Sequence, residues 1–242
     1  NKTARTDANV IIDGQSAADE FGNAVASAGD FNGDGKDDVI IGAPTDDNNS
    51  NNTSGSAFIF FGGITGTKRA ADANVILDGQ NAGDRFGISV ASAGDFNGDG
   101  KSDVIVGADK DGNTGSAFIF FGGITGTKRA DADADVILNG QSANDVFGRS
   151  VASAGDFNGD GKDDVIVGAD LDDNNSLAQS GSAFIFFGGI TGTKTADADA
   201  DVILNGQSAD DRFGYSLASA GDFNGDGTSD IIVHARSDDN NS

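Results

Sequence analysis

The sequence uses one nine-residue segment four times, beginning at Asp30, Asp95, Asp156 and Asp222. The copies follow one another at intervals of 65, 61 and 66 residues. A Phe-Gly pair precedes each copy, and short apolar runs follow it. Repetition at a nearly fixed period predicts a fold built from one supersecondary unit, because each unit then covers the apolar face of its neighbour.

The apolar runs of each repeat are short, rich in β-branched and aromatic residues, and bounded by Gly, Asp or Asn. In the third repeat they lie within residues 150–155, 164–169, 181–189 and 201–207. This pattern predicts four short strands per repeat, with the nine-residue segment between the first and the second strand. The Thr-Gly-Thr-Lys segment ahead of the last strand is predicted to be a turn.

The third strand of each repeat indicates how the sheets are covered. Alternation along this strand sends Phe58 and Phe60 to one face of the sheet and Ile59 and Phe61 to the other. Both faces therefore need cover, which a sheet receives when it stands between two similar sheets. We predict an all-β fold, a β-propeller built of four blades of four antiparallel strands, with the small residues of each first strand innermost.

The blades are predicted at about residues 21–78, 86–138, 147–205 and 213–242 of a single repeat array that spans residues 1–242. Residues 9–13 match a last strand and are predicted to be an outer strand of the closing or preceding blade.

The predicted strands number 15, because the last blade is missing its Phe-rich third strand. Three explanations are open: a strand supplied by another molecule, a chain that is a fragment, or a ring that closes with an incomplete blade. An unpaired apolar edge favours self-association or the binding of another extracellular protein.

The nine-residue segment has the pattern of a calcium loop. Asp or Asn oxygens stand at its first, third, fifth and ninth positions, and glycine stands at the sixth. Calcium takes six to eight oxygen ligands, and glycine permits the tight turn that brings alternate side chains together. We predict one Ca2+ site per repeat, with the backbone carbonyl of the seventh residue as a further ligand and water completing the shell. The predicted ligands are Asp30, Asn32, Asp34, Lys36, Asp38, Asp95, Asn97, Asp99, Lys101, Asp103, Asp156, Asn158, Asp160, Lys162, Asp164, Asp222, Asn224, Asp226, Thr228 and Asp230.

The alternative to four calcium sites is four solvated turns that bind nothing. Asp, Asn and Gly also dominate ordinary turns, so a single copy of the pattern would be a moderate signal. Four copies at matching positions favour the metal sites. Three carboxylates within nine residues also repel one another without a cation, which disfavours the alternative.

The composition excludes several classes of partner. The net charge of −24 disfavours nucleic acid and anionic membrane surfaces, because both repel an acidic protein. No apolar run approaches the ~18 residues of a membrane span, so no membrane insertion is expected. Cysteine is absent, which excludes disulfides and thiol chemistry. Weak calcium sites fill only where calcium is abundant, so we expect an extracellular or cell-surface location. No signal peptide is recognisable, and the sequence starts at Asn1 without Met.

Three motifs together resemble the FG-GAP repeat: the Phe21-Gly22 pair, the loop 30–38 and Gly42-Ala43-Pro44. This repeat is the blade of the integrin alpha-subunit β-propeller and of many bacterial secreted proteins. The resemblance covers nearly the whole chain and implies calcium in the loop between the first two strands. The sequence departs from the family after the second strand, since Gly-Ala-Pro occurs only in the first copy, and four repeats stand where integrin propellers have seven blades. The integrin ligand-binding role relies on loops and a partner subunit that this sequence does not match, so it is not carried over.

A few residues stand out from the repeats. His234, the only histidine, replaces a strand glycine and lacks the partners of a catalytic triad, so we interpret it as a local packing variant. No nucleophile motif is present, and zinc is disfavoured without a Cys or His cluster. Arg85, Arg149 and Arg212 lie near the Phe-Gly pairs and are expected to pair with spare carboxylates. Asp37 is interpreted as a solvated charge.

These observations predict a calcium-binding structural or adhesive protein rather than an enzyme, a subunit of a cell-surface layer, sheath or filament. One alternative is a lectin-like propeller that binds a glycan, although the chain has no Trp and only one Tyr, Tyr215. Another is a non-catalytic accessory domain of a secreted hydrolase. Asn48, Asn51 and Asn174 fit the N-glycosylation pattern, but unless the host glycosylates, the Asn-rich composition of these loops is the favoured explanation.

Overall fold

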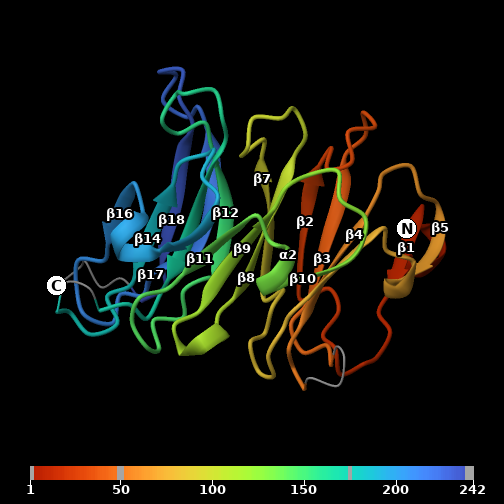
Figure 1. Cartoon of the computed structure of the whole chain (residues 1–242), viewed down its shortest axis with the longest axis horizontal. Coiled ribbons are helices and arrows are strands. Elements are labelled where there is room, and N and C mark those ends of the chain that lie inside the picture. The colour runs from red at the N-terminus through yellow and green to blue at the C-terminus, as the bar shows by residue number, and fades with distance from the viewer. Residues whose placement is uncertain (1–2, 48–51, 174–175, 238–242) are drawn as a thin grey trace.

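The structure is a computed structural model, and it describes residues 3–47, 52–173 and 176–237. Its strands stand in groups side by side along the longest axis of the molecule (Figure 1). The strands are β1 (Val10–Asp13), β2 (Ala24–Gly29), β3 (Asp38–Ala43), β4 (Ser56–Phe60), β5 (Gly66–Arg69), β6 (Val75–Asp78), β7 (Ser89–Gly94), β8 (Asp103–Ala108), β9 (Ser116–Phe120), β10 (Gly126–Arg129), β11 (Val136–Asn139), β12 (Ser150–Gly155), β13 (Asp164–Ala169), β14 (Ser182–Phe186), β15 (Gly192–Thr195), β16 (Val202–Asn205), β17 (Phe213–Gly221) and β18 (Asp230–Ala235). The helical segments are α1 (Ala4–Asp7), η2 (Ala70–Asp72), η3 (Asp111–Asn113), α2 (Ala130–Asp133) and α3 (Ala196–Asp199).

Four blades follow one another in chain order. The first three are the antiparallel sets β2-β3-β4-β6, β7-β8-β9-β11 and β12-β13-β14-β16, in order from the first to the last strand of each blade. The fourth consists of β17 and β18 within the described residues. These sheets confirm the all-β fold and the repeated propeller blade. They form an open array, since no described strand joins the first blade to the fourth.

The Thr-Gly-Thr-Lys segments are strands, and their prediction as turns is wrong. They form β5, β10 and β15, and each pairs in parallel with the outer strand that precedes it in the array, as Gly126 does with Val75. An outer strand has one free edge of main-chain N–H and C=O groups, which a short polar strand from the next repeat satisfies. The second blade is thereby tied to the first, and the third to the second, by main-chain hydrogen bonds. With these three strands the described residues contain 18 strands rather than 15.

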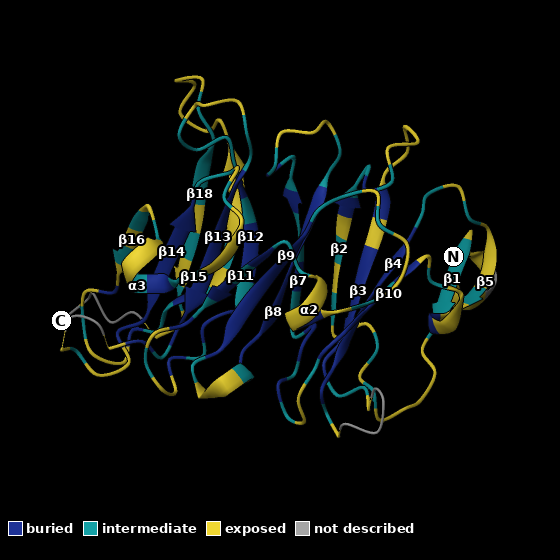
Figure 2. Cartoon of the chain, in the orientation of Figure 1, coloured by how far each residue is buried: buried dark blue, intermediate teal, exposed yellow. Residues whose placement is uncertain are grey.

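The third strands form the centre of the fold. Every residue of β4, β9 and β14 is buried, and Figure 2 shows these strands in dark blue. Their Ser-Ala-Phe-Ile-Phe sequence is apolar on both faces because both faces are covered. Neighbouring blades cover both faces of β9 and β14, whereas the outer face of β4 is covered by Phe21 and by Ile12 of β1. The first strands β2, β7, β12 and β17 lie against one another, and their small side chains allow that close approach.

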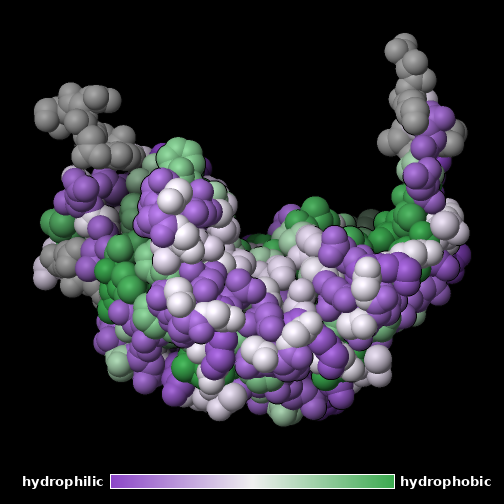
Figure 3. All heavy atoms as spheres, turned by 90° about the horizontal axis from the view of Figure 1, so that it is seen from above, coloured by the Kyte–Doolittle hydropathy of each residue, from purple (hydrophilic) through white to green (hydrophobic). Residues whose placement is uncertain are grey.

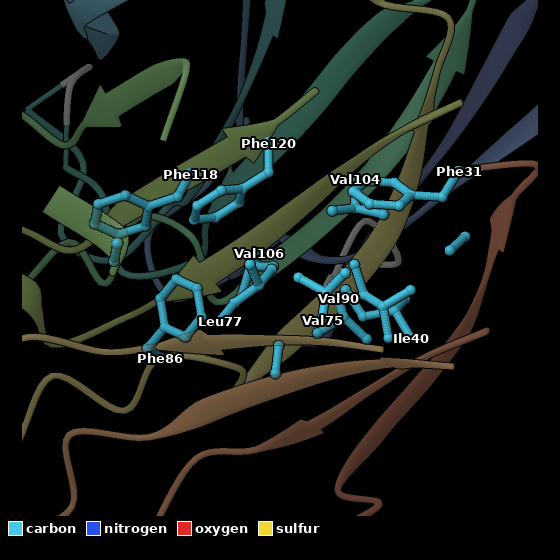
Figure 4. Packing of buried hydrophobic residues seen from close by; sticks show 14 of the residues in the cluster. Phe31, Ile40, Val75, Leu77, Phe86, Val90, Val104, Val106, Phe118 and Phe120 are labelled. Atoms are coloured by element: carbon cyan, nitrogen blue, oxygen red, sulfur yellow. The ribbon is translucent and has the colours of Figure 1, made fainter. Parts of the chain in front are cut away.

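Three of the four hydrophobic clusters in the described residues lie between two blades, and the remaining one covers the outer face of the first blade with Phe21 and with Ile12 of β1. Figure 4 shows Phe86 of the second blade beside Phe118 and Phe120 of the same blade, with Leu77 of the first blade next to them, while Ile40 of the first blade lies beside Val90 of the second. A matching cluster joins the second and third blades. Burial of one large side chain contributes about 1.5–3 kcal/mol, so the contacts between blades are a main source of stability.

The four blades curve into an arc with a concave side (Figure 3). Apolar side chains are exposed at both ends of this arc. Val25 of the first blade is 68% exposed, and Ile232 and Phe223 of the fourth are 60% and 86% exposed. None of the described helices has the length and apolar character needed to cross a membrane.

Candidate metal centres

Each predicted calcium loop connects the first and second strands of a blade, as in the first blade between β2 and β3. Asp30 accepts hydrogen bonds from the backbone N–H groups of Asp34 and Gly35, both at 2.9 Å. Asn32 Oδ1 accepts a second bond from the Asp34 N–H at 2.7 Å. The same three bonds recur in the other loops at 2.7–3.1 Å. The four loops therefore share one geometry, set by backbone groups that wrap around side-chain oxygens.

Glycine is required inside the loop by backbone conformation. Gly33 and Gly35 have φ angles of 76° and 86°, in the left-handed region that L side chains adopt at a cost. A Cβ on Gly35 would meet nothing within 4 Å, so its conformation, and not lack of space, excludes other residues. This confirms the physical reason for the glycine in the pattern.

The carboxylate at the ninth position of the loop is buried and links the loop to the neighbouring strand, as Asp38 does in the first blade. Asp38 Oδ1 accepts a bond from the Gly62 N–H at 2.7 Å, and its Oδ2 accepts one from the Asn32 N–H at 3.2 Å. The loop is thereby tied to the end of β4. Burial raises the pKa of Asp38 and Asp164, and it raises the pKa of Asp103 to about 6. Keeping these carboxylates charged is unfavourable without a cation, so the ninth position has both a structural use and a metal-binding potential.

The fourth loop differs at its ninth position. Asp230 accepts bonds on Oδ2 from the N–H groups of Phe223 and Asn224, at 2.8 and 3.1 Å. Its Oδ1 accepts a bond from the Asn224 side chain at 3.2 Å, where the other loops have a glycine N–H from the end of the third strand. Asp230 is only partly buried. The four loops therefore share one sequence pattern but differ at the ninth position. Its carboxylate is buried in the first three loops and only partly buried in the fourth.

Consecutive loops touch through the eighth position, which the sequence analysis missed. The carbonyl of Asp30 accepts the N–H of Ser102 from the next loop at 3.2 Å. The Asp95 N–H donates to the side chain of Asp163 at 2.7 Å. Asp37, at the same position in the first loop, was interpreted as a solvated charge and is exposed. No signal in one sequence separates its role from those of Ser102 and Asp163, because the contact needs the loop of a preceding blade.

The loops offer the oxygen ligands that a hard cation takes. Each presents carboxylates, one amide and backbone carbonyls, with no nitrogen or sulfur ligand, which suits calcium. The three carboxylates of one loop do not lie within 4.8 Å of one another, since their oxygens accept backbone N–H groups. The Lys36 ammonium lies 3.1 Å from Asp34 Oδ2, and its hydrogen bond lowers the pKa of Asp34. The ligand set named from the sequence stays a prediction.

A second acidic region lies at the opposite ends of the strands. Asp145, Asp172 and Asp173 bring one carboxylate oxygen each within 4.8 Å of the others, the single such group in the described part of the chain. Burial raises the pKa of Asp145 to about 7, and the neighbouring Asp172 adds to the shift. Burial likewise raises the pKa of Asp84 to about 6, helped by Asp111. The pair Asp84 and Asp111 in the second blade thus corresponds to the pair Asp145 and Asp172 in the third. The spacing of the calcium loops did not predict these pairs.

The arginines named from the sequence partly pair as expected. Arg85 and Arg149 both contact Asp109 Oδ2, at 3.3 and 3.4 Å, and Arg149 lies 3.5 Å from Asp170. These ion pairs join the second and third blades through the two buried carboxylates of Asp109 and Asp170. Arg212 instead donates to the Gln179 side chain at 3.3 Å.

The N-glycosylation patterns fall largely outside the described residues. The segments 48–51 and 174–175 hold most of them.

Comparison with known proteins identifies the repeat. A family model described as FG-GAP repeat matches residues 21–60, 86–120, 147–186 and 213–241, more than half of the chain. The chain belongs to the FG-GAP repeat family. The FG-GAP blades coincide with the four repeats inferred from the nine-residue segments.

The curated relatives of this FG-GAP chain include integrin alpha subunits. Integrin alpha-5 of Xenopus laevis is 35% identical over 167 residues, covering 64% of this chain and 15% of the relative. Integrin alpha-6 of Homo sapiens is 34% identical over 167 residues, covering 67% and 14%. Integrin alpha pat-2 of Caenorhabditis briggsae is 29% identical over 240 residues, covering 90% and 18%. The chain therefore spans less than a fifth of the length of each of these relatives.

Proposed function

We propose that this chain is a calcium-stabilised, extracellular adhesive module of integrin-like FG-GAP blades, without catalytic activity. The observation that carries the proposal is the row of four loops, which repeat one oxygen-rich geometry at one end of the blades. Successive loops are joined by hydrogen bonds such as that from the Ser102 N–H to the Asp30 carbonyl. A cation bound in one loop would also stiffen the contact with the next.

Calcium would act here on stability rather than on chemistry. Each loop concentrates negative charge, and in three loops a carboxylate is buried, as Asp103 is. A divalent cation neutralises this charge, and its binding free energy adds to the folding free energy. Affinities in the range of extracellular calcium modules would keep the loops filled outside cells and empty in the cytosol. That dependence supports the extracellular location.

The adhesive role is supported by the family and by the ends of the arc. The relatives are integrin alpha subunits, and the apolar side chains exposed at both ends of the array offer surfaces for assembly into a layer, sheath or filament. The net charge of −24 keeps isolated molecules apart and makes association sensitive to cations.

Calcium titration of the full chain by isothermal calorimetry tests the first part. We expect four calcium ions per chain and a higher unfolding temperature in millimolar calcium than in chelator. Replacing the fifth-position carboxylates, as in Asp34→Asn and Asp99→Asn, lowers the stoichiometry by one site per substitution. Asp37→Asn is the matched control, since it removes one exposed charge from the same loop and leaves four sites. Unchanged stoichiometry in the Asp34 and Asp99 variants would refute the ligand assignment.

Light scattering tests assembly. Species larger than one chain in millimolar calcium, which dissociate in chelator, are expected if the module assembles through its ends. A single-chain mass in both conditions would contradict self-association under these conditions.

A further inference from the structure

The first and second loops are alike in sequence but are held differently by the loop that follows them. Both read Asp-Phe-Asn-Gly-Asp-Gly-Lys over their first seven positions and end on Asp at the ninth, so they offer the same predicted ligands. The following loop contacts them through its eighth residue, which is Ser102 at the first junction and Asp163 at the second. A difference in calcium binding between the two loops therefore has its source outside the predicted ligands.

Asp163 of the third loop holds the backbone of Asp95 at two points. The Asp95 N–H donates to Asp163 Oδ2 at 2.7 Å, and the Asp95 carbonyl accepts the Asp163 N–H at 3.3 Å. The carboxylate acceptor makes the first bond charge-assisted, and such bonds are stronger than bonds between neutral groups. Asp163 is half-buried, so water competes less for its carboxylate than at an exposed site.

The carboxylate of Asp163 reaches the second loop because a glycine leaves room for it. Gly94 precedes Asp95, and a Cβ on Gly94 would lie 2.1 Å from Asp163 Oδ2. At the first junction a Cβ on Gly29 would lie 2.2 Å from the hydroxyl of Ser102. The same space is therefore filled by a hydroxyl at the first junction and by a carboxylate at the second.

The serine junctions have only one of the two bonds. The Asp30 carbonyl accepts the Ser102 N–H at 3.2 Å, and the Asp156 carbonyl accepts the Ser229 N–H at 3.1 Å. In the part of the chain that the structure describes, neither serine hydroxyl accepts the N–H of the aspartate. Among the three described junctions, the two-point contact belongs to the one between the second and third blades.

Asp95 is the residue around which the second loop closes. Its carboxylate accepts the N–H groups of Asp99 and Gly100 at 2.8 and 2.9 Å, and it is the first predicted calcium ligand of the loop. The affinity of a calcium site depends on the charge and the rigidity of its ligands. Holding the Asp95 backbone in place reduces the ordering that binding requires, because the loop is already arranged around this residue.

A contact that only docked one blade on the next would affect the two adjoining loops alike, because Asp163 stands beside Asp164, the ninth residue of the third loop. The two bonds are instead directed at the first ligand of the second loop. We propose that Asp163 is a positioning residue for calcium in the second loop, on the preceding blade, and that this loop therefore binds calcium more tightly than the first. This inference rests on the proposed calcium sites and ranks them.

Site-resolved calcium titration of the full chain by heteronuclear NMR tests the proposal. The amides of the sixth-position glycines report the four loops separately: Gly35, Gly100, Gly161 and Gly227. In the parent protein the second loop should fill at a lower calcium concentration than the first. Asp163→Ala should weaken calcium binding in the second loop about tenfold, as expected for the loss of a residue that orients a ligand, and in the third loop less than about twofold.

Asp163→Asn separates the hydrogen bond from the charge. Its amide oxygen still accepts the Asp95 N–H, so calcium binding in the second loop should stay within about threefold of the parent. Equal affinities of the second loop in the Ala and Asn variants would assign the effect to charge and overturn the positioning role. Equal weakening of the second and third loops by Asp163→Ala would assign the contact to blade docking and overturn it as well.

Ser102→Asp is the reciprocal change at the first junction. It puts a carboxylate in the space beside Gly29 and should tighten calcium binding in the first loop about threefold. Asp37→Ala is the matched control for Asp163→Ala, since it removes an exposed carboxylate from the eighth position and should change each affinity by less than about twofold. An unchanged first loop in Ser102→Asp would contradict the role of the carboxylate.

The titration distinguishes failure of this inference from failure of the proposed function. If no sixth-position glycine responded to millimolar calcium, the calcium sites would be refuted and this inference with them. If all four responded and Asp163→Ala left the second loop unchanged, the calcium sites would stand and only the positioning role of Asp163 would be refuted.

Discussion

The second and fourth blades contain almost the same sequence around their loops, yet their loops have different surroundings. Phe96, the second residue of the second loop, is fully buried between two blades, whereas Phe223 at the same position of the fourth loop is 86% exposed. Ile105 and Ile232 differ in the same way. The difference shows that burial in this array is set by the neighbouring blade, as in other repeat proteins in which each unit contacts only its neighbours.

The largest effect on stability is expected from removing the buried Phe96 side chain. Phe96→Ala leaves a cavity between the second and third blades and should lower the free energy of unfolding by about 3–5 kcal/mol. Phe223→Ala, the same change at an exposed position, should alter it by less than about 0.5 kcal/mol. Urea unfolding of both variants measures the contrast. Similar losses would mean that Phe223 is covered in solution, which would contradict its exposure.

The glycine at the blade junction gives the next largest effect. Gly168→His copies the residue of the fourth blade into the third and forces a side chain against the Gly214 carbonyl, 2.1 Å from the added Cβ. We expect a loss of about 3 kcal/mol, concentrated in the docking of the fourth blade. Hydrogen exchange should show faster opening of β17 and β18, with little change in β3 and β4.

The reciprocal change, His234→Gly, is the control for this junction. It removes an exposed side chain and should leave the exchange of β17 and β18 nearly unchanged. If Gly168→His left the fourth blade as protected as in the parent, the close contact between Gly168 and Gly214 would not limit docking of the fourth blade.

A smaller contrast concerns the ninth loop position without calcium. Asp103 accepts the N–H groups of Gly122 and Asn97 at 2.8 and 3.1 Å and is fully buried, so Asp103→Ala leaves buried donors unpaired. The expected loss in chelator is about 2 kcal/mol. Asp230→Ala should have a smaller effect, about 0.5 kcal/mol, because water replaces the lost acceptor. Thermal unfolding in excess chelator separates this bracing role from metal binding, and equal losses would show that burial does not matter here.

The sequence was sufficient for the repeat, the antiparallel strands of the blades and the loop positions, because each depends on local patterning. Alternation in Ser-Ala-Phe-Ile-Phe predicted a strand buried on both faces, and β4, β9 and β14 are such strands. Gly35 was assigned to a tight turn and has the positive φ that such a turn needs. These features require no knowledge of the neighbouring blade.

The features that the sequence did not predict all depend on a second blade. Gly126–Arg129 has polar, exposed residues and looks like a turn, and only pairing with β6 makes it a strand. His234 occupies the position of Gly168 in the third blade, and the sequence analysis interpreted it only as a packing variant. The sequence gives no sign of the close contact between Gly168 and Gly214, because that contact forms only between two blades. The link from Asp95 to Asp163 joins two loops through residues that are 68 positions apart in the sequence. A single repeat carries no signal for such contacts.

The smallest expected effect is a pH dependence that belongs to the interior blades. Burial raises the pKa of Asp145 to about 7 and of Asp84 to about 6, above the ordinary value of 3.8. Between the unfolded and folded pKa values the folded chain binds more protons, so stability should increase as the pH falls from about 8 to about 5. The reversed sign, stability falling over this interval, would contradict these raised values.

Asp145→Asn assigns part of this pH dependence to one residue. The amide keeps an acceptor for the Ser142 N–H and removes the charge, so the variant should gain on the order of 1 kcal/mol at pH 8 and little at pH 5. Asp37→Asn, an exposed carboxylate of the first loop, is the control and should leave the slope unchanged. Unfolding of the three proteins in chelator at both pH values measures the difference. An equal slope in Asp145→Asn and the parent would place the titrating groups elsewhere, whereas a reduced slope would show that buried acidic clusters distinguish the interior blades from the ends.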